Sequence, residues 1–360
     1  MSMLNGRRDE AERTGRKVNV AILGAGSIAN TMATTLVKMA EDSRYSSWIH
    51  PYAVAARDRG RAEAFAAKYG FDTAYGSYAD MAADDNVDLV YIATPHNFHA
   101  EQAIMCLKAG RNVLVEKAFT ANAAQARALL NVAEETGLLA TEAIWTRYQP
   151  SRDLINELVH SGELGTIRSV RAELSYEPHG RDRITNPDLA GGALLDVGVY
   201  ALNFIDMAVG ADHGRSIADI VTTMVPYSTG VDATNTTVLT YDDGLLATAT
   251  SSRAVASDRS GVICGDNGYA VVTNINNPER IDVYNTDHSL RHSIAVPEQL
   301  TGYEYEVAAA ANAILDGRTE CPEMPHADTL RIMELMDEIR GRWGLKYPCL
   351  LYTSDAADDM

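Results

Sequence analysis

The stretch VNVAILGAGSIA, residues 18–29, decides the fold of this 360-residue chain. Its apolar first half predicts a β-strand over Val18–Leu23, and the apolar spacing that follows predicts a helix through Met39. Between them, Gly24–Ala29 follows the pattern G-x-G-x-x-A where the strand would turn into the helix. This combination is typical of a turn that holds the pyrophosphate of a dinucleotide.

Each position of this turn has a physical reason. Gly24 permits the tight turn, Gly26 lets the backbone approach a phosphate, and Ala29 lets the helix pack closely against the strand. Ser27 and Ile28 open the helix, whose positive end would face the phosphates. An ordinary strand–helix turn is the alternative interpretation, and the αβ units that follow argue against it.

Four further strand-length runs follow, and helical patterns separate them. The runs are Pro51–Ala56, Val87–Ala93, Asn112–Glu116 and Leu138–Glu142. Strands that alternate with helices in this way predict a doubly wound parallel sheet covered on both faces. We therefore expect a Rossmann dinucleotide-binding domain over residues 18–142, preceded by a polar, disordered leader of residues 1–17.

The pattern changes after residue 142, where strand-length runs begin to follow one another. Examples are Ile167–Tyr176, Thr234–Tyr241, Leu245–Ser251 and Tyr269–Thr273, with Asp242-Asp243-Gly244 as one hairpin turn. These runs and their flanking helices predict a second α/β domain over residues 143–348, with an open, mostly antiparallel sheet. The final stretch CLLYTSDAADDM, residues 349–360, resembles translated adapter sequence. We interpret it as a non-native tail, with a genuine polar tail as the alternative.

The composition argues against several classes of protein. Acidic residues outnumber basic ones by 49 to 31, and the net charge of -18 disfavours a nucleic-acid partner. No apolar run approaches the roughly 18 residues of a membrane span. The four cysteines lack disulfide or zinc spacing, and with the absent export signal they predict a cytoplasmic protein. His96 and His99 have no evident third ligand, so we expect no metal.

The end of the second strand distinguishes between the two nicotinamide cofactors. An enzyme that uses NAD usually has an acid there, which accepts hydrogen bonds from the ribose 2′-hydroxyl. This chain has Arg57 after Ala55-Ala56, and a guanidinium can pair with the 2′-phosphate of NADP. NADP is therefore the expected cofactor. NAD remains open, because Arg57 and Arg59 also fit a solvated basic turn and Asp58 also fits a ribose acceptor.

Four more motifs complete a series in one order along the chain. They are ATPHNFH (residues 93–99), EKA (116–118), EAIWTR (142–147) and GGALLDVGVY (191–200). With the glycine turn, this series resembles the glucose–fructose oxidoreductase / inositol dehydrogenase (Gfo/Idh/MocA) family over about residues 18–343. Within the family, the chain is most similar to the branch of the dimeric dihydrodiol dehydrogenases and the NADP-dependent D-xylose dehydrogenases.

The resemblance implies roles for residues of these motifs. Residues expected to line the cofactor pocket are Thr94, Pro95, Asn97, His99, Glu116 and Lys117. Residues expected to line the substrate pocket are Trp145, Arg147 and Tyr176. The family usually has proline after the lysine, whereas Ala118 restricts the lysine backbone less. The resemblance also implies a homodimer formed through the exposed face of the open sheet.

Lys117, Tyr200 and Asp196 are the expected catalytic residues. Asp196 and Tyr200 stand four apart on a predicted helix, so they share one face. An alcohol must lose its proton as hydride leaves its carbon, and a tyrosine with a pKa of about 10 is a poor base unless an ammonium lies nearby. We therefore expect Lys117 and Tyr200 to form the acid/base pair, with Asp196 orienting a substrate hydroxyl or the lysine. Singly, each also fits a structural role as a surface lysine, a core tyrosine or a buried acid.

Together these features predict an NADP-dependent oxidoreductase that moves hydride between a nicotinamide and a hydroxyl- or carbonyl-bearing carbon of a small sugar, polyol or dihydrodiol. The alternative is a non-catalytic NADP-binding regulator on the same fold. Retention of both Lys117 and Tyr200 argues against it, because a sensor has no need for an acid/base pair. A third possibility is a sugar oxidoreductase that never releases its cofactor.

Overall fold

The chain forms two compact units in a computed structural model that describes residues 15–177 and 182–351. Residues 1–14 of the predicted leader and residues 352–360 of the predicted tail lie outside this description. Unit 1 takes the chain up to Tyr148 together with Gln299–Met333, and unit 2 takes Gln149–Glu298 and the chain from Glu334 onward. The division therefore differs from a single boundary at residue 142: the buried, alanine-rich helix α10 (Glu304–Leu315) packs on β5 and α2 of unit 1.

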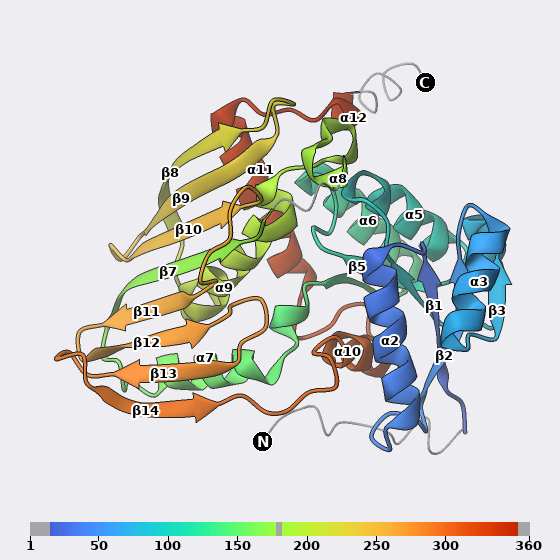
Figure 1. Cartoon of the computed structure of the whole chain (residues 1–360), viewed down its shortest axis with the longest axis horizontal. Helices are drawn as coiled ribbons and strands as arrows, with labels where there is room; N and C mark the ends of the chain where they lie inside the picture. Colours follow the sequence, from blue (N-terminus) through green and yellow to red (C-terminus); the bar gives the residue numbers. More distant parts are fainter. Residues whose placement is uncertain (1–14, 178–181, 352–360) are drawn as a thin grey trace. The chain divides into compact units, whose positions relative to one another are not determined.

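Unit 1 contains the predicted parallel sheet (Figure 1). Its strand order is β3-β2-β1-β4-β5-β6, and every neighbouring pair is parallel. The strands are β1 (Val18–Leu23), β2 (Ile49–Ala55), β3 (Thr73–Tyr75), β4 (Leu89–Ile92), β5 (Asn112–Glu116) and β6 (Ala140–Ala143). The connecting helices are α2 (Ser27–Glu41), α3 (Arg59–Tyr69), α4 (Tyr78–Ala82), α5 (His96–Lys108) and α6 (Ala123–Thr136). The doubly wound prediction is confirmed; the short β3 was missed.

Unit 2 contains an eight-stranded sheet of order β14-β13-β12-β11-β7-β10-β9-β8. The strands are β7 (Ile167–Ser175), β8 (Ile217–Pro226), β9 (Asp232–Tyr241), β10 (Leu246–Ser252), β11 (Gly261–Gly265), β12 (Gly268–Thr273), β13 (Arg280–Tyr284) and β14 (Leu290–Ala295). Only β7 and β10 pair in parallel, so the mostly antiparallel prediction is confirmed. Helices α7 (Pro150–His160) and α9 (Val199–Val209) pack together on one side of this sheet, as does the end of α11 (His326–Trp343), where Trp343 donates to Thr222 of β8 at 3.1 Å.

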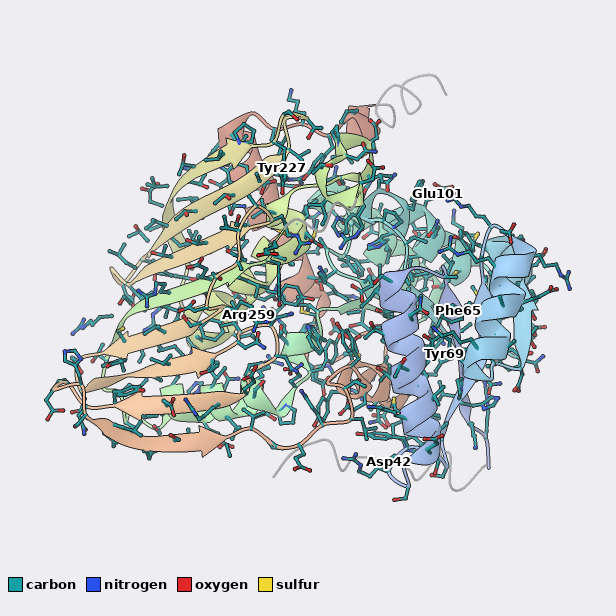
Figure 2. The ribbon with its side chains drawn as sticks, in the orientation of Figure 1. Asp42, Phe65, Tyr69, Glu101, Tyr227 and Arg259 are labelled. Carbon is teal, nitrogen blue, oxygen red and sulfur yellow. The ribbon has the colours of Figure 1, made fainter. Side chains whose placement is uncertain are left out.

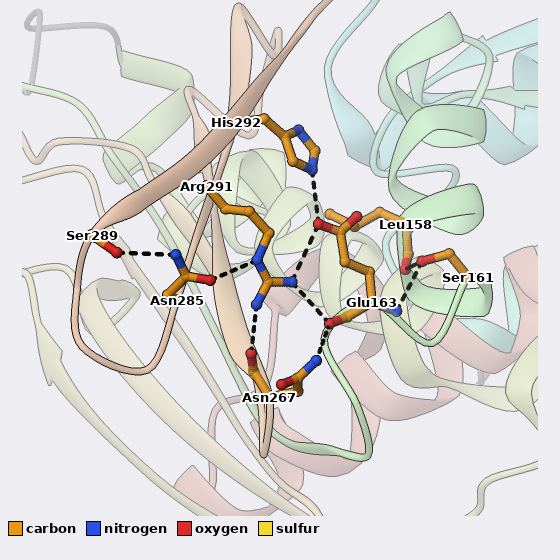
Figure 3. A network of polar contacts seen from close by, with 8 residues as sticks. All are labelled: Leu158, Ser161, Glu163, Asn267, Asn285, Ser289, Arg291 and His292. Carbon is orange, nitrogen blue, oxygen red and sulfur yellow. Dashed lines mark hydrogen bonds and ion pairs between the residues drawn. The ribbon is translucent and has the colours of Figure 1, made fainter.

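A polar network fastens the last hairpin of unit 2 to the turn after α7 (Figure 3). Glu163 accepts from Arg291 at 3.3 Å and faces the Nε2 atom of His292 at 2.8 Å. The same guanidinium donates to the carbonyl oxygen of Asn267 and to the side chain of Asn285, both at 2.8 Å. This edge strand is therefore held by side chains as well as by its ladder.

One helical stretch, Pro187–Val209, is long and apolar enough to cross a membrane by length and composition. Its most apolar 18-residue window is entirely buried within the structure, as in the core of a globular domain. The stretch contains a π-helical turn, η4 (Leu194–Gly198), which continues directly into α9. The helix predicted from residue 191 thus begins a few residues later, and its first turn is π-helical.

Candidate active site

The glycine turn of unit 1 is built for close backbone approach. Gly24 has a φ of 105°, and a Cβ there would lie 3.0 Å from the carbonyl oxygen of Ala93. At Gly26 a Cβ would meet no described atom closer than 3.9 Å. Packing against Ala93 therefore requires glycine at position 24. Gly26 instead leaves open space beside the start of α2. Ala29 is fully buried against the sheet, as close helix–strand packing demands.

The turn is fastened to the neighbouring helix α3. Asn30 donates to the carbonyl oxygen of Gly26 at 2.6 Å, and its side-chain oxygen accepts from the hydroxyl of Tyr69 at 2.8 Å. Figure 2 labels Tyr69 and its ring partner Phe65 on α3. No side chain of the described residues caps α2, so its first backbone N–H groups remain available to an anion.

Two arginines follow the end of β2. The charges of Arg57 and Arg61 both act on Tyr78, whose pKa is nevertheless raised because burial outweighs them. Arg61 donates to the carbonyl oxygen of Ala25 at 2.7 Å, which places its guanidinium against the glycine turn. Asp58 accepts from the backbone N–H of Arg61 at 2.7 Å and caps α3. This arrangement favours helix capping over the ribose-acceptor alternative for Asp58.

The loop after β4 lies beside the loop after β1 because the two strands are neighbours in the sheet. Thr94 and Pro95 lead into α5, and the side-chain oxygen of Asn97 is buried without a hydrogen-bond partner among the described residues. His99 is fully buried, with Nε2 2.8 Å from the carbonyl oxygen of Thr94 and Nδ1 3.0 Å from that of Ala118. Burial lowers the pKa of His99 despite these two acceptors. The ring therefore joins two loops of the expected cofactor pocket.

Lys117 is half-buried at the carboxyl end of β5, the edge where doubly wound sheets bind ligands. Its peptide bond to Ala118 is cis. The buried carboxylate of Glu116 accepts from the hydroxyl of Tyr91 and from the backbone N–H of Lys117, the latter at 3.2 Å. Glu116 therefore supports the backbone of the predicted catalytic lysine from inside unit 1.

Two more buried carboxyl groups of unit 1 act on this region. Glu142 accepts from the backbone N–H of Phe119 at 3.1 Å, and burial raises its pKa to about 7, although Lys117 is among the charges that lower it. Burial first and then the charge of Glu116 raise the pKa of Glu306 well above its ordinary value. Neither carboxyl oxygen of Glu306 has a partner among the described residues. Burial in the interior of unit 1 therefore favours the protonated form of both acids.

Two of the predicted substrate residues have firm partners within unit 1. Trp145 stacks on Tyr303 with ring centroids 4.0 Å apart. Arg147 has a fully buried side chain that donates to Asp328 at 2.8 Å. The buried guanidinium of Arg147 uses this carboxylate to compensate for its lost hydration, and its role in a substrate pocket remains a prediction.

In unit 2, a buried carboxylate sets the start of the predicted catalytic helix. Gly192 has a φ of 115°, and a Cβ there would lie 2.1 Å from Oδ1 of Asp232. A Cβ at Gly191 would lie 2.6 Å from the carbonyl oxygen of Ile184. Asp232 accepts from the backbone N–H of Leu194 at 2.7 Å, and burial raises its pKa to about 7. The two glycines are therefore required by packing against this acid and its neighbouring loop.

Asp196 and Tyr200 are both buried, Asp196 in the π-helical turn η4 and Tyr200 in α9, and their expected shared face remains a prediction. Arg183 donates to Oδ1 of Asp196 at 3.0 Å, and Nε of Arg253 lies 3.2 Å from Oδ2. Both carboxylate oxygens are therefore engaged by arginines, which the sequence analysis did not anticipate. The expected role of Asp196 toward a substrate hydroxyl or a lysine remains a prediction.

Tyr176 directly follows β7 and is half-exposed. Its hydroxyl accepts from Asn276 at 2.9 Å. The guanidinium carbons of Arg253 and Arg259 lie 5.7 and 5.6 Å from the centre of its ring. The predicted substrate residue is thus flanked by two cations.

The features of unit 1 fit a nicotinamide dinucleotide. The open space at Gly26 and the uncapped start of α2 suit a pyrophosphate, and Arg57 and Arg61 suit a further phosphate beyond β2. The unpartnered oxygen of Asn97 is an acceptor whose burial is unfavourable unless a ligand donates to it. Within residues 15–177 and 182–351, no group of three or more His, Cys, Asp or Glu side chains is arranged to hold a metal ion.

The fold and these features define a Rossmann-type oxidoreductase with a second α/β unit. Two family models match the chain: the oxidoreductase family with an NAD-binding Rossmann fold over residues 18–143, and the GFO/IDH/MocA C-terminal domain over residues 153–271. The chain belongs to the Gfo/Idh/MocA oxidoreductase family, which confirms the resemblance read from its motifs.

Relatives match over nearly the whole chain. The trans-1,2-dihydrobenzene-1,2-diol dehydrogenase of Mus musculus is 33% identical over 335 residues, covering 91% of this chain and 97% of the relative. The D-xylose 1-dehydrogenase (NADP(+)) of Hypocrea jecorina is 32% identical over 379 residues, covering 94% of each. Among solved structures, a 3-ketoreductase of Actinomadura kijaniata in complex with NADP and TDP-benzene is 27% identical, with a TM-score of 0.79 over 90% of this chain and 97% of that one.

Several residues of the site escaped sequence reasoning. Arg61 had a local signal, because it stands four residues after Arg57 at the start of a predicted helix. Arg253 and Arg259 had none: Arg253 comes to Tyr176 through the parallel pairing of β7 with β10, and Arg259 through the loop before β11, the antiparallel neighbour of β7. Sequence distance concealed this contact, which only the sheet topology creates.

Proposed function

We propose that this protein is an NADP-dependent oxidoreductase that transfers hydride between a nicotinamide and a hydroxyl- or carbonyl-bearing carbon of a sugar, polyol or dihydrodiol. The observation that carries the cofactor choice is the pair Arg57 and Arg61 after β2, with Asp58 turned away to cap α3. The named activities of the mouse and Hypocrea jecorina relatives support the substrate range, and the NADP-bound 3-ketoreductase supports the cofactor.

In this proposal each residue of unit 1 has one task. The backbone at Gly26 and the start of α2 bind the pyrophosphate, and Arg57 and Arg61 bind the 2′-phosphate. Asn97 accepts a hydrogen bond from the ligand. His99 holds the loop after β4 to the loop after β5 through the carbonyl oxygens of Thr94 and Ala118. The bound nicotinamide supplies or accepts the hydride.

The proton is handled by Lys117 and Tyr200. Tyr200 holds the proton that leaves or returns to the substrate oxygen, and the ammonium of Lys117 favours the phenolate form. The carboxyl of Glu116 fixes the backbone of Lys117, and the two arginines fix Asp196 one turn before Tyr200. These assignments extend the sequence prediction, and substitution of the two residues tests them.

A substrate screen tests the proposed function. The purified protein is assayed with aldoses, polyols and cyclic diols, with NADP and NAD in parallel, and formation of the reduced cofactor is followed. We expect turnover of at least one of these classes, with NADP preferred. Tight NADP binding with no turnover across the panel would instead favour the non-catalytic regulator. Nicotinamide absorbance that survives purification would identify an enzyme that never releases its cofactor.

We also propose a homodimer through the face of the eight-stranded sheet that is opposite α11. Val221 and Val225 of β8 are each 64% exposed on this face, next to half-exposed threonines of β9. Exposed apolar side chains in such a row favour a protein partner, and the expected partner is a second copy. Light scattering should report a dimer that Val221→Lys converts to a monomer; a monomeric parent protein contradicts the proposal. A cytoplasmic location is proposed as well, in keeping with four free cysteines, and cell fractionation tests it.

A further inference from the structure

Two arginines of unit 2 contact one carboxylate, and a third lies over the same tyrosine ring as one of them. Arg183 and Arg253 both contact Asp196, at 3.0 and 3.2 Å. Arg259 has no acidic partner among the described residues, and its guanidinium lies instead over Tyr176. The neighbouring acid Asp258 accepts from Ser260 through both oxygens, at 3.2 and 2.9 Å, and is therefore turned to its own loop. The cluster carries an excess of positive charge in a chain whose net charge is -18.

The sheet topology explains why these groups converge. In the parallel pair β7 and β10, Ser175 stands opposite Ser252, so Tyr176 and Arg253 leave the sheet side by side. The backbone N–H of Tyr176 donates to the carbonyl oxygen of Ser252 at 3.0 Å and holds this register. The carboxyl ends of β7 and β10 therefore bring the ring of Tyr176 and the side chain of Arg253 together.

The loop that carries Arg259 closes the same end of the sheet. The carbonyl oxygen of Arg259 accepts from the backbone N–H of Ile275 at 2.8 Å, and the next residue, Asn276, donates to the hydroxyl of Tyr176. Figure 2 labels Arg259 close to the start of β11. Both the loop and the strand ends are therefore fixed, so the guanidiniums are held in place before any ligand arrives.

Two guanidiniums lie beside one ring, and the ring compensates only part of their charge. The side chain of Arg253 is 7% exposed, so solvent screens it little. The hydroxyl of Tyr176 already accepts from Asn276, and its own proton remains available to donate. Cations and one hydroxyl donor around a half-exposed ring form a receptor for oxygen atoms that carry negative charge.

From this cluster we infer that the substrate carries an anionic oxygen group, a carboxylate or a phosphate, which Arg253, Arg259 and the hydroxyl of Tyr176 bind. This inference rests on the proposed function and narrows its substrate class from neutral sugars to sugar acids or sugar phosphates. Asp196 contacts both Arg183 and Arg253, so this one carboxylate balances only one of the two charges.

The kinetic test compares matched substrates on the NADP-loaded protein. Neutral aldoses are compared with the corresponding uronic acids and sugar phosphates. We expect kcat/KM to be about tenfold to a hundredfold higher for an anionic member, because a hydrogen bond to a charged group contributes that much. Arg259→Met should remove this preference mainly through KM. Arg280→Met is the matched control, because its side chain is 59% exposed and pairs with Asp282 on β13, and it should retain the preference.

Binding of inorganic phosphate separates this inference from the proposed function. Saturation with NADP occupies the phosphate sites of unit 1, so calorimetry then reports unit 2. Millimolar phosphate should bind the parent protein and the Arg280→Met variant, and it should bind Arg259→Met at least tenfold more weakly. If no sugar of either charge is turned over but this difference persists, the proposed function fails and the anion site stands. Equal kcat/KM for neutral and anionic sugars, or equal phosphate affinity in the two variants, overturns the anion site.

Discussion

The predicted catalytic residues of unit 1 and unit 2 stand in opposite electrostatic surroundings. Around Lys117 the interior of unit 1 is rich in acids, with Glu116, Glu142 and Glu306 all buried. Around Asp196 unit 2 is rich in arginines. In unit 1, burial raises the pKa of Glu142 and of Glu306, which favours their uncharged forms. Arginine stays protonated at neutral pH, so in unit 2 the positive charge is balanced by Asp196 and, as we propose, by an anionic ligand.

The largest expected effect separates the chemical roles of the two units. Lys117→Met and Tyr200→Phe should each lower kcat by about a hundredfold to ten-thousandfold, because each removes a partner in proton transfer. NADP affinity, measured by fluorescence titration, should stay within a few-fold of the parent protein.

Two substitutions of the same kind serve as controls. Lys108→Met removes an exposed lysine at the end of α5, and Tyr284→Phe alters a tyrosine of β13 that stacks on Tyr269. Both should retain kcat. If Lys117→Met lost NADP binding to the same extent as turnover, Lys117 would belong to the cofactor scaffold and the division of roles would be wrong.

The next effect is on stability, and each unit offers one buried acid with a pKa of about 7: Glu142 in unit 1 and Asp232 in unit 2. The unfolded forms lose their protons near pH 4 to 5, whereas the folded forms keep them until about pH 7. The folded state therefore binds more protons in this window, and stability falls as pH rises through it. Glu142→Gln and Asp232→Asn should each make the free energy of unfolding depend less on pH, by up to roughly 3 kcal/mol.

Chemical denaturation at pH 5 and pH 8 measures this difference. Glu135→Gln, an exposed acid of α6, is the control and should follow the parent protein at both values. If the stability of Glu142→Gln depended on pH as strongly as that of the parent protein, Glu142 would have an ordinary pKa. The inference that burial keeps this acid protonated would then be wrong. The two acids belong to different units, so their effects should add.

Sequence patterns predicted the fold because strand and helix periods are local. The glycine turn, the strands around Lys117 and the helix with Asp196 and Tyr200 all follow from residues within one or two turns of each other. The return of Gln299–Met333 to unit 1 could not be predicted, because α10 has the same apolar pattern whichever core it joins. The role of Asp232 was equally hidden, since its partner Leu194 is 38 residues away.

The smallest expected effect concerns cofactor preference and depends on three arginines at the start of α3. Arg57→Ala should weaken NADP binding about tenfold to a hundredfold while changing NAD binding little, because only the 2′-phosphate is lost as a partner. Arg61→Ala should weaken both cofactors, because Arg61 also supports the glycine turn through Ala25. Arg59 pairs with Glu63 at 2.9 Å, so Arg59→Ala should leave the preference intact. An unchanged ratio of NADP to NAD affinity in Arg57→Ala would mean that unit 1 selects its cofactor through groups other than Arg57.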